Sequence, residues 1–136
     1  MKESSRQAAI RLALASRGDN VFWRNSVGRA TYYKDGKTCP KCKKPTLGAR
    51  TWTVPYGLCP GSSDLIGLVN IESMAVPVAV FVGLEVKNAK GTESENQIKY
   101  RNLVNDRGGV VEVVRTPEEA NDAIDRIRRL EPWISR

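Results

Sequence analysis

Apolar residues follow helical spacing in some segments of the chain and strand spacing in others. Over residues 3–17 they recur every three or four positions, as on one face of a helix, and Gly18 follows where a helix often ends. Residues that favour strands are concentrated in segments 21–25, 62–69 and 110–114. The pattern therefore predicts an amino-terminal helix and at least three separate strands.

The most apolar segment, residues 78–87, is predicted to be an interior strand. One face carries Val78, Val80, Val82, Leu84 and Val86, and the other carries Ala79, Phe81, Gly83, Glu85 and Lys87. A strand that is apolar on both faces over most of its length belongs inside a sheet covered by helices. Glu85 and Lys87 therefore emerge on the same face, at the carboxyl end of this strand.

Two more helices are predicted after this strand. The first runs over about residues 92–106 and ends at the glycines that follow. The second begins after Thr116, where Pro117 suits the first helical position and Glu119 completes a capping box, and it runs to about residue 130. The order of helix, three strands, helix, strand and helix describes a single-domain α/β sandwich, in which helices flank a small mixed sheet.

Residues 34–60 interrupt this order, because their content of Lys, Pro and Gly predicts an excursion from the core, either a long loop or a small ribbon. The residues just before them carry the signals of a turn or hairpin. The longest apolar run, residues 74–84, contains Pro77 and is far shorter than the roughly 20 residues of a membrane span. We therefore expect no membrane association and a cytoplasmic location, in a bacterium or a phage-infected cell.

Positive charge is concentrated in the first part of the chain. Residues 1–50 hold twelve Lys and Arg against three acidic residues, whereas the remainder holds ten basic and twelve acidic residues. Such a surplus attracts phosphate backbones, so DNA is the expected partner, although solvated surface charge is the simpler explanation. The candidate phosphate contacts are Arg24, Asn25, Arg29, Lys34, Lys41, Lys43 and Lys44. Trp23, Trp52 and either Tyr32 or Tyr33 could stack on bases.

The three cysteines raise the question of zinc. Cys39 and Cys42 have the spacing of a zinc knuckle, but a structural zinc site normally has four nitrogen or sulfur ligands. Only Cys59 remains, and the chain has no histidine. A fourth ligand would have to be a carboxylate such as Asp35, a water or a partner chain. Reduced thiols in a loop are the alternative.

Two carboxylates are predicted to meet where neighbouring strands begin and end. Asp64 lies at the start of one predicted strand and Glu85 at the end of the next, so the two converge if these strands pair. Oxygen ligands of this kind suit Mg²⁺ or Mn²⁺. Lys87 would then stand beside a water whose pKa the metal lowers, and its ammonium would stabilise charge developing at an attacked phosphate.

Five sequence elements follow one another over nearly the whole chain. They are Glu3 with Gln7, the triplet WRN at 23–25 followed by Gly28, GSSDLIG at 61–67, EVK at 85–87, and Ser94 with Gln97. In this order and spacing the chain resembles the PD-(D/E)xK nuclease superfamily, and specifically its VRR-NUC family of replication and repair nucleases. Residues 110–120 also look like the closing strand and helix of that family.

The resemblance implies a restriction-endonuclease-like fold and an endonuclease that depends on Mg²⁺ or Mn²⁺. It implies metal ligands at Asp64, Glu85, the Val86 carbonyl and Glu3, a catalytic Lys87, and support from Gln97 at the same centre. Stand-alone members of the family are structure-selective DNA nucleases, and some act as homodimers on Holliday junctions. Ser63 stands where the superfamily pattern has Pro, and residues 34–60 do not match the family pattern.

Each candidate residue also has a purely structural explanation. Glu85 and Lys87 could form an ion pair at a sheet edge, and Asp64 could cap a turn after Gly61. Gln97 could belong to a capping box with Ser94, which is compatible with a catalytic role. Glu3 could be a favourable charge at a helix amino end. The sequence thus supports two functions, a nuclease that cuts branched, flapped or junction DNA and a non-catalytic nucleic-acid-binding module.

Overall fold

The computed structural model describes residues 3–34, 38–44, 50–72 and 75–134, without the side chains of Glu3 and Tyr33. The chain divides into two compact units. The sheet unit comprises Met1–Asn25 and Pro60–Arg136, and the ribbon unit comprises Ser26–Cys59. Each unit is described by itself below.

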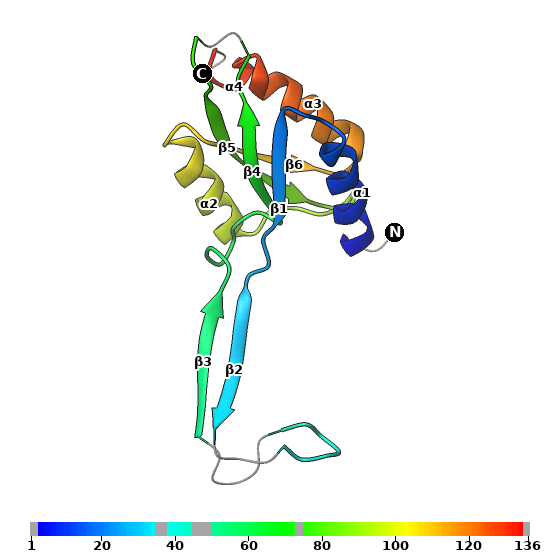
Figure 1. The fold of residues 1–136 in the computed structure, drawn as a ribbon, viewed down its shortest axis with the longest axis vertical. Coiled ribbons are helices and arrows are strands. Elements are labelled where there is room, and N and C mark those ends of the chain that lie inside the picture. The colour runs from blue at the N-terminus through cyan, green and yellow to red at the C-terminus, as the bar shows by residue number, and fades with distance from the viewer. Residues whose placement is uncertain (1–2, 35–37, 45–49, 73–74, 135–136) are drawn as a thin grey trace. The chain divides into compact units, whose positions relative to one another are not determined.

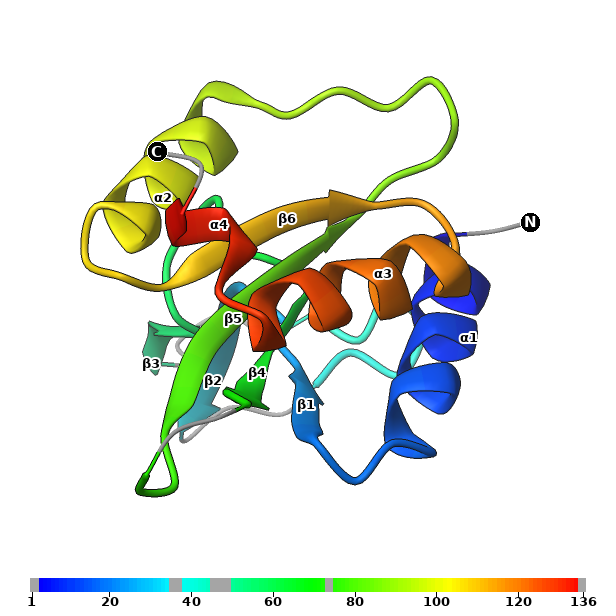
Figure 2. The same ribbon diagram turned by 90° about the horizontal axis from the view of Figure 1, so that it is seen from above.

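The sheet unit is an α/β structure built around one small mixed sheet (Figures 1 and 2). Its elements are α1 (Glu3–Ala15), β1 (Asn20–Arg24), β4 (Leu65–Asn70), β5 (Ala79–Val86), α2 (Glu95–Asn105), β6 (Val110–Val114), α3 (Pro117–Arg128) and α4 (Glu131–Ile134). The strands lie in the order β1-β4-β5-β6, with β5 and β6 parallel and the other neighbours antiparallel. The predicted α/β class with a small mixed sheet is therefore confirmed.

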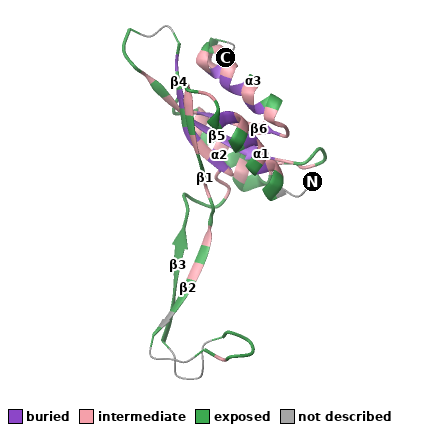
Figure 3. Ribbon diagram, turned by 45° about the vertical axis from the view of Figure 1, so that its right-hand side comes forward, coloured by how far each residue is buried: buried purple, intermediate pink, exposed green. Residues whose placement is uncertain are grey.

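The hydrophobic core lies between one face of this sheet and the helices α1 and α3. Alternate residues of β5 supply it from the sheet, and three fully buried isoleucines and one leucine supply it from the two helices. Buried residues are purple in Figure 3. Its members include Ile10, Leu14, Leu65, Val82, Leu84, Val86, Ile124 and Ile127. The predicted alternation along residues 78–87 is confirmed, because the Val82 face is the core face. Figure 1 shows α2 on the other side of the sheet, the face to which Glu85 belongs.

Some helix boundaries differ from the prediction. Helix α1 ends at Ala15, and Gly18 has no left-handed φ, because the chain already closes the helix with a bond from the Arg17 N–H to the Leu14 carbonyl. Helix α3 ends at Arg128, since Leu130 adopts a φ of 64° and turns the chain into α4. After α2, Gly108 adopts a φ of 83°, which confirms the predicted stop there.

The predicted capping box of α3 forms only in part. Thr116 Oγ1 accepts the Glu119 N–H at 3.1 Å, as expected of an N-cap. The Glu119 carboxylate, however, accepts the N–H of Arg115 at 2.8 Å and not that of Thr116. The start of this helix is thus stabilised by the side chains of Thr116 and Glu119, which accept the backbone N–H groups of Glu119 and Arg115, respectively.

The ribbon unit contains a two-stranded antiparallel ribbon, formed by β2 (Gly28–Lys34) and β3 (Arg50–Tyr56). Both strands are largely exposed along their length (Figure 3). Of the two conformations predicted for residues 34–60, the described part contains the ribbon. Within the described residues, the helices are all too short or too polar to cross a bilayer.

Candidate functional site

The start of β4 and the end of β5 bring Asp64 and Glu85 to the same end of the sheet. The register pairs Leu65 with Leu84, so the next positions outward set Asp64 opposite Glu85. The backbone N–H of Val86 donates to Asp64 Oδ2 at 2.9 Å, which joins the Asp64 carboxylate to the end of β5. The two predicted carboxylates therefore lie on adjoining strand ends.

The loop before Asp64 is held in place by Asn25. Its side-chain amide donates to Ser62 Oγ at 2.7 Å and to the Ser63 carbonyl at 2.9 Å, and its backbone N–H donates to the Asp64 carbonyl at 2.8 Å. Asn25 was proposed from the sequence as a phosphate contact. These bonds give it a positioning role for the loop that carries Asp64, and the phosphate contact stays a prediction.

Glycine is required at position 61 of this loop. Its φ is 89°, and a Cβ there would lie 2.5 Å from the backbone of Asn96 in the first turn of α2. Such an approach is closer than any side chain tolerates, and the left-handed φ also favours glycine. Gly61 thus lets the loop lie directly against the start of α2.

Glu85, Lys87 and Gln97 form a connected polar cluster. Glu85 is only 4% exposed, and its Oε1 lies 2.9 Å from the Lys87 ammonium and 2.5 Å from Gln97 Nε2. Lys87 Nζ also donates to Gln97 Oε1 at 3.1 Å. A buried carboxylate needs such partners, because burial without them would favour its neutral form.

Gln97 forms the capping box predicted from the sequence and also contacts Glu85 and Lys87. Its Oε1 accepts the N–H of Ser94 at 2.8 Å, while Ser94 Oγ accepts the N–H of Gln97, which completes a capping box at the start of α2. The same oxygen accepts from Lys87 and the amide nitrogen donates to Glu85. The helix cap therefore fixes the side chain that orients the cluster.

Helix α1 approaches the end of β5 through a residue that sequence reasoning missed. Arg6 Nη1 donates to the carbonyl of Lys87 at 3.0 Å, and the neighbouring Gln7 is buried. Arg6 lies one helical turn after Glu3, and this spacing is the signal that could have identified it. The Glu3 side chain, predicted as a supporting ligand, lies outside the described residues.

Ser63 is buried at the centre of this end of the sheet. It is 1% exposed, and its Oγ has no hydrogen-bond partner among the described residues. A Cβ on Gly83 of β5 would lie 2.5 Å from this oxygen. The small residue at 83 therefore makes room for Ser63, and thereby for the turn into Asp64.

The oxygen ligands at this site fit Mg²⁺ or Mn²⁺. No group of three or more His, Cys, Asp or Glu in the described part of the chain is arranged to hold a metal. Mg²⁺ does not require one, because it keeps several waters and is commonly held by one or two carboxylates together with substrate phosphate. Asp64 and Glu85 supply two carboxylates on adjoining strand ends, and Val86 follows Glu85 in the chain.

A hollow of about 510 Å³ lies at the same end of the sheet, beside β6. It is lined in part by Val113, the residue that pairs with Glu85 in the parallel register, and by Arg101 and Arg115. Arg101 is paired with Glu93, whereas Arg115 donates to the carbonyl of Gly91. The sequence did not indicate these arginines, since only the fold brings them near Glu85.

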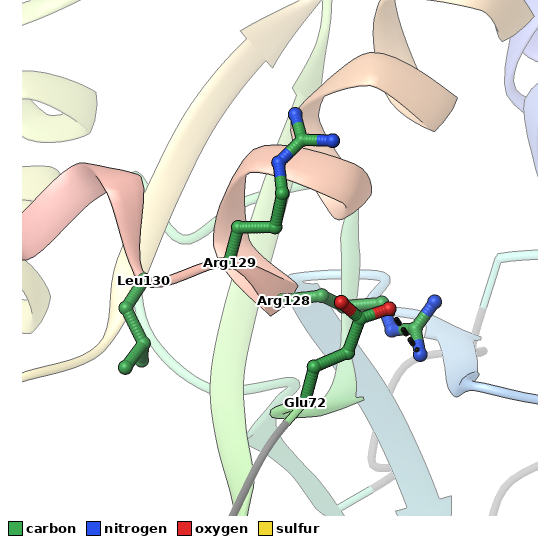
Figure 4. Close-up of a pocket in the computed structure, with 4 residues that line it drawn as sticks. All are labelled: Glu72, Arg128, Arg129 and Leu130. Carbon is green, nitrogen blue, oxygen red and sulfur yellow. Dashed lines mark ion pairs between the residues drawn. The ribbon is translucent and has the colours of Figure 1, made fainter.

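A second pocket, of about 230 Å³, lies beyond the other end of β4 (Figure 4). Glu72, Arg128, Arg129 and Leu130 line it, and Arg128 forms an ion pair with Glu72 at 2.8 Å. Arg128 also pairs with Asp19. This pocket contains none of the predicted site residues, and its charged side chains are already in ion pairs, Arg128 with Glu72 and Arg129 with Glu131.

The remaining predicted contacts are exposed. Arg24 lies in β1, and the other five lysines and arginines lie in the ribbon unit, at positions 29, 34, 41, 43 and 44. No ion pair occurs within the described part of the ribbon unit. The single acidic residue of this unit, Asp35, is not among the described residues. These cations are thus placed where a polyanion could reach them.

Cys39 and Cys42 form a close pair in a turn. The backbone N–H of Cys42, its thiol and the N–H of Lys41 bond to the Cys39 thiol and lower its pKa. Lys43 follows with a φ of 58°, and its N–H donates to the Cys39 carbonyl. Cys59 does not join them in a group of three ligands among the described residues, and none of the three cysteines forms a disulfide.

No model of a protein family matches the chain, and no curated protein matches it.

Proposed function

We propose that this protein is a divalent-metal-dependent DNA endonuclease that hydrolyses phosphodiester bonds. The main support is that four polar side chains come together from two adjacent strands and a helix. Asp64 lies at the start of β4, Glu85 and Lys87 at the end of β5, and Gln97 in the first turn of α2. A buried carboxylate beside an ammonium, with a second carboxylate on the neighbouring strand end, suits phosphoryl-transfer chemistry.

The order of the elements in the sheet unit supports the same proposal. Once the ribbon unit is set aside, helix, three strands, helix, strand and helix follow one another from α1 to α3, as in a restriction-endonuclease-like fold, and the short α4 comes after them. On this proposal the chain is similar to VRR-NUC nucleases and prefers branched, flapped or Holliday-junction DNA in replication, repair or recombination. Symmetric cutting of a junction would require a second copy of the chain, because one site cuts one strand.

Each residue of the cluster has a separate role in this proposal. Asp64 and Glu85 would hold Mg²⁺ or Mn²⁺, with the Val86 carbonyl as a further ligand. Such an ion supplies Lewis acidity at the phosphoryl oxygen and lowers the pKa of water. The Lys87 ammonium stabilises negative charge that develops at the phosphate. Gln97 positions Glu85 and Lys87, and Asn25 positions the loop before Asp64.

The test is cleavage of a labelled panel of duplex, flap, fork and four-way-junction DNA with Mg²⁺ or Mn²⁺. We expect the wild-type protein to cut a branched substrate and Lys87→Ala to cut it about 10²- to 10³-fold more slowly, because one stabilising donor is lost. Lys90→Ala is the matched control, since it removes an exposed ammonium three residues away. Its rate should equal that of the wild type.

Two outcomes would contradict the proposal. Equal cleavage by Lys87→Ala and the wild type would show that the activity comes from elsewhere. Binding of these substrates without cleavage in either metal would favour the non-catalytic nucleic-acid-binding module.

A further inference from the structure

One face of the ribbon carries aromatic and apolar residues along most of its length. The antiparallel register sets Gly28 opposite Tyr56, Ala30 opposite Val54, Tyr32 opposite Trp52, and Lys34 opposite Arg50. Directly opposite residues share a face of a two-stranded sheet. The alternate positions, on the opposite face, are Arg29, Thr31, Tyr33, Thr51, Thr53 and Pro55. Most of the aromatic and apolar positions of the ribbon therefore lie on the face that carries Tyr32 and Trp52.

The Tyr32 and Trp52 rings form an exposed stacked pair. Their centroids lie 5.8 Å apart with an angle of 19° between the planes. Tyr32 is 51% exposed and Trp52 is 48% exposed. Because large aromatic side chains contribute most when they are covered, this pair presents ring surface that a planar ligand could cover.

The next cross-strand pair on the same face as the rings consists of two cations. Lys34 and Arg50 lie directly opposite one another, an arrangement that destabilises a strand pair through repulsion between like charges. The ribbon unit holds seven Lys and Arg against one Asp, a net charge of +6 in 34 residues. An anion between Lys34 and Arg50 would relieve the repulsion.

We propose that the face formed by Tyr32, Trp52, Lys34 and Arg50 binds unpaired nucleotides. Bases stack on the two rings, and the phosphates of the same strand contact the two cations. This combination of an aromatic platform with adjacent positive charge is how proteins bind single strands without reading their sequence. The inference rests on the proposed function only in taking nucleic acid as the ligand.

The exposed rings favour single strands over duplex DNA. A two-stranded ribbon can enter the major groove, but the groove presents base edges, whereas ring stacking needs the flat faces of bases. In a duplex those faces are covered by neighbouring bases. Flaps, forks and gaps contain unpaired nucleotides, so this face would select the branched substrates proposed for the nuclease.

The test measures binding by fluorescence anisotropy in EDTA, so that no metal-dependent cleavage occurs. The probes are labelled oligo(dT) and oligo(U) of about 20 nucleotides, longer than the site of one small domain, and a duplex of the same length. We expect oligo(dT) to bind more tightly than the duplex, and Trp52→Ala to weaken that binding about tenfold. Oligo(U) shows whether the ligand is DNA alone or either nucleic acid.

Two variants control for position and for charge. Thr31→Val with Thr53→Val changes the opposite face of the same strands and should leave affinity unchanged. Lys34→Gln with Arg50→Gln should lower the slope of log affinity against log salt by about 1.4, because each phosphate contact on a single strand contributes about 0.7. An unchanged slope would show that Lys34 and Arg50 do not contact the phosphates.

If Trp52→Ala disrupts the ribbon, a fluorescence measurement can still test whether Trp52 contacts the ligand. Oligo(dT) should quench part of the tryptophan emission of the wild-type protein, and Trp52→Phe, which keeps an aromatic ring, should abolish that part while retaining most of the affinity. The inference is overturned if Trp52→Phe leaves the quenching unchanged, or if the duplex binds as tightly as oligo(dT).

These results are separable from those for the proposed function. Lys87→Ala should bind oligo(dT) as tightly as the wild type, since Lys87 belongs to the sheet unit. A protein that binds oligo(dT) through Trp52 but never cuts DNA would retain this inference and lose the nuclease. If the protein cuts DNA, and neither Trp52→Ala nor Trp52→Phe changes its binding or fluorescence, the proposed nuclease function is retained and this inference is lost.

Discussion

The two units of this chain use charge in opposite ways. The sheet unit holds fifteen Lys and Arg and fourteen Asp and Glu, a net charge of +1, and every ion pair found among the described residues lies within it. The ribbon unit carries +6 and pairs its cations with no described carboxylate. Its charge remains directed to solvent.

This difference indicates which chemistry each unit can support. A buried carboxylate such as Glu85 needs a packed core around it and fixed polar partners, and among the described residues that core lies in the sheet unit. A surface that attracts a polyanion needs exposed cations and little packing. In the proposed function, catalysis and capture of the substrate would therefore lie on different parts of one short chain.

The largest effect that would sharpen this comparison is on stability. Leu84→Ala removes a fully buried side chain from β5 and should lower the free energy of unfolding by about 3 kcal/mol. Val54→Ala in β3, where the side chain is 42% exposed, should cost less than about 1 kcal/mol. Urea unfolding followed by circular dichroism measures both. Equal costs would mean that the ribbon is as tightly packed as the sheet unit.

The second effect tests the ion pairs that stabilise the sheet unit. Hydrogen bonds from Arg17, then from Asn20, lower the pKa of Asp19 to about 2 from its ordinary 3.8, and Arg128 also pairs with it. This contribution is complete above pH 3.8 and is lost as the pH falls through about 2. Asp19→Asn should therefore destabilise the fold by about 2 kcal/mol at pH 7, and by progressively less toward pH 2.

Urea unfolding at a series of pH values measures this difference. Asp122→Asn is the control, because it removes an exposed carboxylate from α3 without touching Arg17 or Arg128. If Asp19→Asn were no more destabilising at pH 7 than this control, the ion pairs would contribute little to joining α1 and α3.

The smallest effect concerns the repulsion within the ribbon. Lys34→Gln with Arg50→Gln should stabilise β2 and β3 by up to about 1 kcal/mol at low salt, because two like charges no longer face each other. Slower hydrogen exchange of the strand amides would report it. Lys41→Gln removes a cation from outside the paired strands and should leave that exchange unchanged. Faster exchange in the double variant would mean that the cations do not repel.

Local patterns were sufficient to predict most of the elements of the sheet unit. The alternation of residues 78–87 identified the core face of β5, and Ser94 and Gln97 marked the capping box of α2. Those signals are local, since a strand alternates every residue and a cap involves neighbours along the chain. Helix ends were less predictable. Helix α3, for example, is followed by a left-handed φ at Leu130, where no glycine in the sequence marks the turn.

The sequence by itself thus determined which residue types could make a metal site and where charge would accumulate. Only the tertiary structure decided that Asn25 holds the loop before Asp64, that Arg6 contacts the end of β5, and that Gln97 joins Glu85 to Lys87. These contacts connect residues far apart in the chain or on different elements. They depend on strand register and on the packing of α1 and α2, which short-range patterns do not specify.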